Sequence, residues 1–241
     1  MHRVGAIGYD STGALDADAL FDAVISGRYE AALDLCRTAL ARPDIGLRHV
    51  HTVLMLPAIR MVGTAWAEDT ASFEQTSMAF SLLHRLLDQL ALATPPERPH
   101  WTSATLQAAQ QRLMVAVAPG DSHSFGARIL TQELRLRGWG VAFFDHGQCD
   151  RVISALSELH FDTLAISVSC DESLAGLSDF VTTCRMASRD PGLEIVVGGA
   201  AIQAPFEQYI FLQADKVGLR IEEVVAALSL REVERQRVKW N

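Results

Sequence analysis

Residues 120–126, Gly-Asp-Ser-His-Ser-Phe-Gly, hold the side chains in this sequence that are best suited to chemistry. An apolar run at 113–118 precedes them and a helical pattern follows, which predicts a strand–loop–helix corner, where open α/β sheets place ligand sites. There one ring nitrogen of His123 can reach a metal above the sheet, while Asp121 can accept a hydrogen bond from the other ring N–H and so fix the tautomer. Gly126 leaves room for a bulky group at the first turn of the helix. An aspartate N-cap beside an ordinary loop histidine is the alternative interpretation.

The Asp-x-His-x-x-Gly pattern resembles the cobalamin-binding domain of methionine synthase and the corrinoid proteins. In that family a serine element and a Gly-Gly pair follow at fixed distances. Here forty residues separate Gly126 from Ser167, and twenty-eight separate Ser169 from the pair Gly198-Gly199. Both spacings fit the family, although Ser169 stands where the family has leucine. The resemblance extends from about residue 112 to about residue 230.

This resemblance implies a cofactor site and a role for each matched residue. His123 would be the lower axial ligand of cobalt, with Asp121 and Ser173 as its relay, because Ser173 falls where the family has a serine bonded to the motif aspartate. The cofactor's own benzimidazole would leave cobalt and enter the sheet. The residues expected to bind the cofactor in this domain are Asp121, Ser122, His123, Ser124, Phe125, Gly126, Ser167, Ser169, Ser173, Gly198 and Gly199. Small side chains and glycines at strand ends suit a narrow slot between strands.

The N-terminal part has the pattern of a helical bundle, with a capping box at Ser72-Phe73-Glu74-Gln75 and a possible bend near Pro57. Residues 56–63 with Trp66 resemble the helical cap that covers the upper face of cobalamin in methionine synthase and in light-sensing regulators. The resemblance implies that Trp66 and Phe73 cover the cofactor. A tryptophan in the bundle core is the alternative. Those light sensors carry Glu-His after the tryptophan, and the absence of that histidine here argues against a bis-histidine switch.

Three prolines within residues 94–99 end the bundle and predict a domain boundary, giving a leader and cap at 1–98 and a cobalamin-binding domain at 99–241. Beyond them, short apolar runs alternate with helical stretches, which predicts an α/β fold with a doubly wound, parallel, five-stranded sheet. The resemblance implies a flavodoxin-like strand order. The expected strands are 113–118, 141–144, 163–169, 194–197 and 216–217, and the expected helices are 124–137, 151–160, 173–188, 205–212 and 221–230.

Composition limits the classes of function. The net charge is −8, so strong independent DNA binding is not expected. Four scattered cysteines indicate reduced thiols in a cytoplasmic protein, with no disulfide frame or zinc-site spacing. We expect no signal peptide and no membrane span, because no uninterrupted apolar stretch approaches about 18 residues.

The stretch Trp66, Asp69, Ser72, Phe73 and the order of the two domains most resemble the AerR/PpaA-type antirepressors of phototrophic bacteria. That resemblance implies a light-responsive transcriptional regulator, not an enzyme, that binds hydroxo-, aquo- or adenosylcobalamin and acts on a partner protein, a DNA-binding repressor of photosynthesis genes. Two alternatives stay open. One is a corrinoid carrier for methyl transfer. The other is a sensor in which His123 binds haem iron on the same fold.

Overall fold

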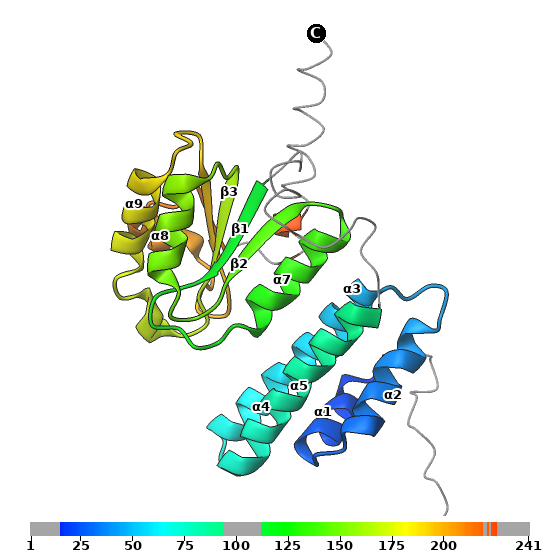
Figure 1. The fold of residues 1–241 in the computed structure, drawn as a ribbon. Helices are drawn as coiled ribbons and strands as arrows, with labels where there is room; N and C mark the ends of the chain where they lie inside the picture. The colour runs from blue at the N-terminus through cyan, green and yellow to red at the C-terminus, as the bar shows by residue number, and fades with distance from the viewer. Residues whose placement is uncertain (1–14, 94–111, 219–220, 222, 226–241) are drawn as a thin grey trace, which may run out of the picture. The chain divides into compact units, whose positions relative to one another are not determined.

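The computed structural model describes residues 15–93, 112–218, 221 and 223–225 (Figure 1). The chain divides into two compact units, residues 1–95 and 96–241, and each is described by itself. The domain boundary expected after residue 98 lies outside the described residues.

The first unit is a bundle of α-helices, as predicted. Helix α1 packs against α2, against the long helical run α3–η1–α4, and against α5. Its interior is apolar and includes the fully buried side chains of Leu20, Val24, Leu83, Leu86 and Leu87. The elements are α1 (Ala17–Ile25), α2 (Tyr29–Leu40), α3 (Leu47–His49), η1 (Val50–Met55), α4 (Leu56–Ala67) and α5 (Phe73–Ala93).

Near Pro57, where a bend was expected, the helical run changes type: the π-helical segment η1 ends at Met55, and Pro57 is the second residue of α4. Proline has no backbone N–H to donate to the helical hydrogen-bond ladder. The π-helical segment has wider turns than an α-helix, and it keeps the chain helical up to the start of α4. The run Leu47–Ala67 has 21 residues and contains an 18-residue window with a mean hydropathy of 1.2, which corrects the expectation that no segment is long and apolar enough to span a membrane. Core helices of bundles meet the same criterion, and this run packs against α1 and α5.

Helix α5 begins with the predicted capping box. The backbone N–H of Gln75 donates to the Ser72 hydroxyl at 3.2 Å, and the backbone N–H of Ser72 donates to the Gln75 side-chain oxygen at 2.9 Å. Two N–H groups at the helix start are thereby satisfied. This reciprocal pair fixes where the chain turns from Trp66 into the helix that carries Phe73.

The second unit contains a parallel sheet in the order β2-β1-β3-β4-β5, which is the flavodoxin-like order that the resemblance implied. Helix α7 (Phe125–Leu136) covers one face, and α8 (Cys149–Glu158) and α9 (Leu177–Ala187) cover the other (Figure 1). Alternate residues of β1 enter the two cores, Val115 on the α7 side and Met114 on the α8–α9 side. The strands are β1 (Arg112–Val117), β2 (Gly140–Phe144), β3 (Thr163–Ser167), β4 (Glu194–Gly198) and β5 (Lys216–Val217).

Three expected elements differ from the structure. Strand β3 ends at Ser167, not at residue 169, because the backbone N–H of Ser169 turns to a side chain instead of to a neighbouring strand. The helix expected at 173–188 is split into a 3₁₀ turn, η2 (Asp171–Leu174), and α9, because Gly176 has a φ of 78°. The helix expected at 205–212 is a 3₁₀ segment, η3 (Phe206–Leu212). Most of the helix expected at 221–230 lies outside the described residues.

Candidate functional site

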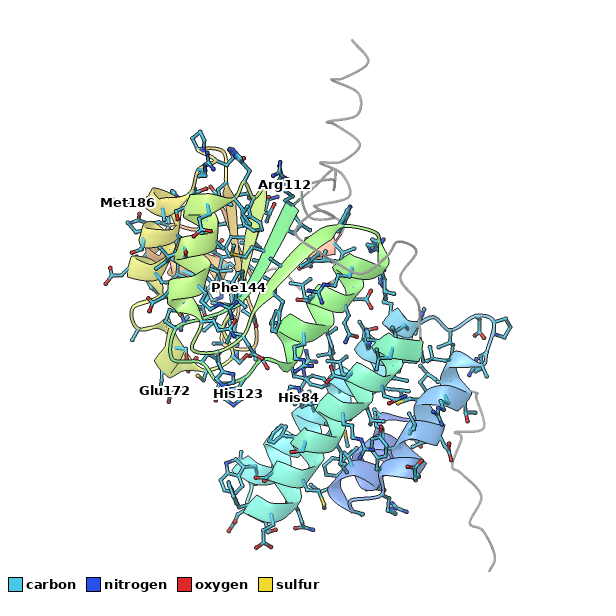
Figure 2. All side chains as sticks on the ribbon, viewed as in Figure 1. His84, Arg112, His123, Phe144, Glu172 and Met186 are labelled. Atoms are coloured by element: carbon cyan, nitrogen blue, oxygen red, sulfur yellow. The ribbon has the colours of Figure 1, made fainter. Side chains whose placement is uncertain are left out.

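The candidate site lies at the carboxyl edge of the sheet, where the strand order reverses. The chain leaves β1 toward α7 on one face and leaves β3 toward η2 and α9 on the other, which is the position where open α/β sheets bind ligands. Figure 2 shows His123 at this edge and Arg112, the first residue of β1, at the opposite edge. The backbone turns sharply at Gly120, whose φ of 76° suits glycine, and this turn carries the chain from β1 into the loop.

Asp121 and His123 form a tightly held pair in this loop. Asp121 is 2% exposed, and its Oδ1 accepts the backbone N–H of His123 at 2.8 Å. The same oxygen lies 2.9 Å from Nδ1 of the imidazole, whose side chain is 61% exposed. A carboxylate only accepts hydrogen bonds, so Nδ1 is the donor in this contact, and in the neutral tautomer that fits it the lone pair lies on Nε2. The pair therefore presents an oriented imidazole that can ligate a metal.

The other oxygen of Asp121 bonds the loop that follows β3. Its Oδ2 accepts a short hydrogen bond from the backbone N–H of Ser169, in the loop after β3. The hydroxyl of Ser169 points back to the carbonyl oxygen of His123 at 3.5 Å. One buried carboxylate thus fixes the imidazole and joins the two loops that diverge from the sheet.

The side chain of Ser173, which the resemblance led us to expect on Asp121, contacts Cys170 in the structure. The Ser173 hydroxyl lies 2.9 Å from Sγ of Cys170. The reason is local: the backbone N–H of Ser173 donates to the carbonyl oxygen of Cys170, and this 3₁₀ turn brings the two side chains together. The hydrogen bond that Asp121 accepts from this loop comes from the backbone N–H of Ser169.

The remaining loop residues differ in what they can offer to a ligand. Ser122 is exposed. Ser124 is buried, and its hydroxyl bonds the carboxyl of Asp145 after β2. Phe125 is 5% exposed and packs inward at the start of α7. A side chain added at Gly126 would meet no atom within 4 Å, so the first turn of α7 has open space above it.

The small residues predicted to line a slot do come together at the ends of β3 and β4. Ser167 and Gly198 are direct register partners on the two strands. The next residue, Gly199, has a φ of 130°, and a Cβ there would collide with the carbonyl oxygen of Val168. Gly199 is therefore required by the backbone alone, whatever else it contacts. Ser169 follows directly after Val168.

Trp66 and Phe73 lie in the first unit, at the end of α4 and the start of α5. Their rings meet edge to face, with centroids 6.0 Å apart and planes at 65°. Trp66 is 53% exposed and Phe73 is 70% exposed. The alternative interpretation of Trp66 as a bundle-core residue is therefore wrong, and the pair forms an exposed aromatic surface on the bundle.

A second carboxylate–imidazole pair, whose geometry the sequence did not predict, follows β2. Nδ1 of His146 lies 3.1 Å from Oδ1 of Asp145, and the imidazole is exposed, as expected for a loop histidine. Partial burial raises the pKa of the Asp145 carboxyl, but hydrogen bonds from His146 and Ser124 outweigh burial and leave that pKa below its usual range.

Sequence reasoning also missed Cys170. Its Sγ and the ligand atoms of Asp121 and His123 all lie within 4.8 Å of one another. The only signal in the sequence is that a cysteine directly follows Ser169, and the strand order is needed to bring it beside a loop 47 residues earlier in the chain.

The residues present fit a corrinoid. A neutral imidazole held by a carboxylate is a suitable nitrogen ligand for cobalt. The open space above Gly126 and the small pair Ser167 and Gly198 leave room beside that ligand.

Comparison with known proteins agrees with this geometry. Residues 111–229 match the family model described as "B12 binding domain", and residues 16–91 match a second model with the same description. An uncharacterized 20.5 kDa protein in the bchF–crtJ intergenic region of Rhodobacter capsulatus is 26% identical over 200 residues, which cover 82% of this chain and 100% of that protein.

Solved structures with a similar fold include the monomethylamine corrinoid protein of Methanosarcina barkeri. It has 17% sequence identity and a TM-score of 0.67, and the match covers 88% of this chain and 96% of that one. A cobalamin-binding protein from Desulfitobacterium hafniense DCB-2 has 14% identity and a TM-score of 0.45, with 90% and 98% of the two chains covered. The matched models fall on both units, and the oriented histidine lies within the larger match, so this chain belongs to the cobalamin-binding B12 binding domain family.

Proposed function

We propose that this protein is a light-responsive transcriptional regulator that binds cobalamin through His123 and acts on a partner protein. The Asp121–His123 pair carries the cofactor part of the proposal, because it presents one oriented nitrogen ligand. The regulatory part is supported by the relative from the bchF–crtJ region, a region of photosynthesis genes. We place the protein with the AerR/PpaA-type antirepressors and in the cytoplasm.

Each part of the site has a role in this proposal. Cobalamin, in a hydroxo-, aquo- or adenosyl form, would supply a light-sensitive cobalt centre. His123 would hold the cobalt through Nε2, and Asp121 would keep the imidazole oriented by accepting the hydrogen bond from Nδ1. Trp66 and Phe73 would exclude water from the bound cofactor, which would give their exposed rings a binding partner.

The partner is a protein, in our proposal a DNA-binding repressor of photosynthesis genes. A net charge of −8 opposes strong binding of this chain to DNA by itself, since neutralised phosphates supply most non-specific affinity. Light can shift partner binding only if the two states of the regulator bind the partner with different free energies. The dark and illuminated forms must therefore differ in affinity for the repressor.

Titration of the repressor with cobalamin-loaded protein, in darkness and after illumination, tests this proposal. We expect the dissociation constant to change on illumination, and the change to be absent in cobalamin-free protein. Equal affinity in all states, together with turnover of a methyl donor when a methyltransferase is added, would establish the corrinoid carrier instead. The fold likeness to the monomethylamine corrinoid protein is what keeps the carrier as the second candidate. A Soret band in protein purified with haem would identify the haem sensor.

A further inference from the structure

Three different donor atoms meet at the candidate site: a carboxylate oxygen, an imidazole nitrogen and a thiol sulfur. Those of Asp121, His123 and Cys170 all lie within 4.8 Å of one another. In a tetrahedral zinc site, bonds of about 2.0–2.3 Å place neighbouring ligand atoms roughly 3.3–3.8 Å apart. Oδ1 of Asp121 and Nδ1 of His123 lie 2.9 Å apart, joined by a hydrogen bond. An ion held by both atoms would replace that bond, and the ring proton would move to Nε2 or to solvent. Small side-chain rotations would therefore gather the three atoms around one ion.

The burial of the three side chains suits this rearrangement, because one is fixed and two are exposed enough to rotate. Asp121 is buried and held by backbone N–H groups, so it serves as the fixed member. The His123 side chain is 61% exposed and Cys170 is partly exposed, so both can adjust. An ion would reach the cluster from the exposed side of His123, and water would complete the tetrahedron.

Ser173 supports the thiol. Its hydroxyl lies 2.9 Å from Sγ of Cys170, and it can donate to the thiolate once the metal has displaced the thiol proton to solvent. Such a hydrogen bond to a metal-bound ligand is a common supporting contact in metal sites. This contact gives Ser173 a role, although it does not bond Asp121.

We propose that the cobalamin-free protein binds one divalent ion of the zinc class through Asp121, His123 and Cys170, and that this ion competes with cobalamin for His123. Nitrogen, oxygen and sulfur donors together favour Zn²⁺ or Co²⁺ over Mg²⁺ or Ca²⁺. The competition rests on the proposed cobalamin site, whereas the metal binding does not. The protein then accepts cobalamin only after the ion has left, which links cofactor loading to the available transition metal.

The first experiment titrates reduced, cobalamin-free, full-length protein with Co²⁺. We expect one ion per chain and a near-ultraviolet sulfur-to-cobalt charge-transfer band. In Cys170→Ala the band should disappear and the affinity should fall by about tenfold or more. The matched control is Cys149→Ala, another partly exposed thiol, which should keep both. A band that persists in Cys170→Ala, or no band in the unsubstituted protein, overturns the proposal.

The second experiment needs no substitution in the site. Zn²⁺ is added to reduced protein before iodoacetamide, and each alkylated cysteine is quantified by mass spectrometry. Zinc should protect Cys170 and leave the alkylation of Cys149 unchanged. Equal alkylation of Cys170 with and without Zn²⁺ overturns the proposal even if Cys170→Ala fails to fold.

The third experiment separates this proposal from the cobalamin site itself. Preloading with Zn²⁺ should slow the uptake of hydroxocobalamin by the unsubstituted protein but not by Cys170→Ala. If zinc does not change the rate of hydroxocobalamin uptake in either protein, the proposed competition is wrong, but the proposed cobalamin site is not contradicted. Zinc binding without any cobalamin uptake would contradict the proposed function and leave the metal site standing.

Discussion

Oδ1 of Asp121 lies 2.9 Å from Nδ1 of His123, and this contact decides which nitrogen of an exposed imidazole is available to a ligand. The aspartate is buried and its other oxygen is bound to the backbone of Ser169. The orientation of His123 is therefore set by the packing of two loops, and it does not depend on a bound cofactor.

His123→Ala is expected to abolish or sharply weaken cobalamin binding, because it removes the proposed ligand to cobalt. The side chain is largely exposed, so the fold should remain. The measurement is the absorption spectrum of hydroxocobalamin retained after gel filtration. His160→Ala, an exposed histidine just before β3 at the opposite edge of the sheet, is the control and should bind normally. An unchanged bound spectrum in His123→Ala would remove this histidine from the site.

Asp121→Asn should weaken both binding and folding. Loss of the charged acceptor removes part of a buried hydrogen-bond set, which should lower the free energy of unfolding by about 1–3 kcal/mol. The substitution also removes the carboxylate that fixes the tautomer of His123, so we expect the affinity for cobalamin to fall about 10–100-fold. Urea unfolding and cobalamin titration measure the two effects. Asp190→Asn, which alters a carboxylate in a turn before β4, should leave the affinity unchanged. The proposal for Asp121 fails if both variants bind equally well.

Gly126→Ala should separate stability from binding. A methyl group there meets no protein atom within 4 Å, and alanine favours the helix, so the free energy of unfolding should rise by up to about 1 kcal/mol. If a corrin approaches this turn, the same methyl group should weaken cobalamin binding.

Gly199→Ala, in contrast to Gly126→Ala, should destabilise the cobalamin-free fold, because its Cβ would collide with the backbone of Val168. Thermal unfolding with and without cobalamin measures both. Full cobalamin affinity in Gly126→Ala would mean that the cofactor does not approach this turn.

Trp66→Ala tests the proposed cap. The ring is more than half exposed, so its removal should cost at most about 1 kcal/mol of stability through its contact with Phe73. If the indole shields cobalt, cyanide should replace the upper ligand of bound cobalamin faster in the variant. Stopped-flow absorbance gives the rate. Leu92→Ala, which removes another exposed apolar side chain of the same bundle, should leave the rate unchanged. Identical rates in Trp66→Ala and the unsubstituted protein would exclude the cap role.

The buried thiol of Cys36 should make the free energy of unfolding decrease at alkaline pH. Burial raises the pKa of this thiol to about 12, above the value of about 8.5 expected in the unfolded chain. The folded state therefore retains the thiol proton over a range in which the unfolded chain loses it. Its contribution is complete below about pH 8.5 and is lost as the pH rises toward 12. Denaturant unfolding from pH 8 to pH 10 should show a steeper decline for the unsubstituted protein than for Cys36→Ala. Parallel declines would mean that Cys36 does not titrate differently on folding.

The sequence determined the elements that depend on neighbouring residues. Alternating apolar runs and helical patterns predicted the five strands to within about two residues at each end, and Ser72 with Gln75 predicted the start of α5. The contact of Asp121 with His123 also spans only two residues, so the motif alone indicated an oriented imidazole. Such features form wherever the chain adopts the local conformation, and a linear pattern is enough to predict them.

Only the tertiary structure decided which distant residues share the site. The strand order and register bring the backbone of Ser169 onto Asp121 across 48 positions of sequence, and they place Cys170 within 4.8 Å of the same pair. The 3₁₀ turn after β3 brings the Ser173 hydroxyl into contact with the thiol of Cys170. Bundle packing leaves Trp66 exposed although its ring is apolar. These outcomes depend on which loops diverge at the reversal of strand order and on which helix faces are already covered, and neither is determined by a short stretch of sequence.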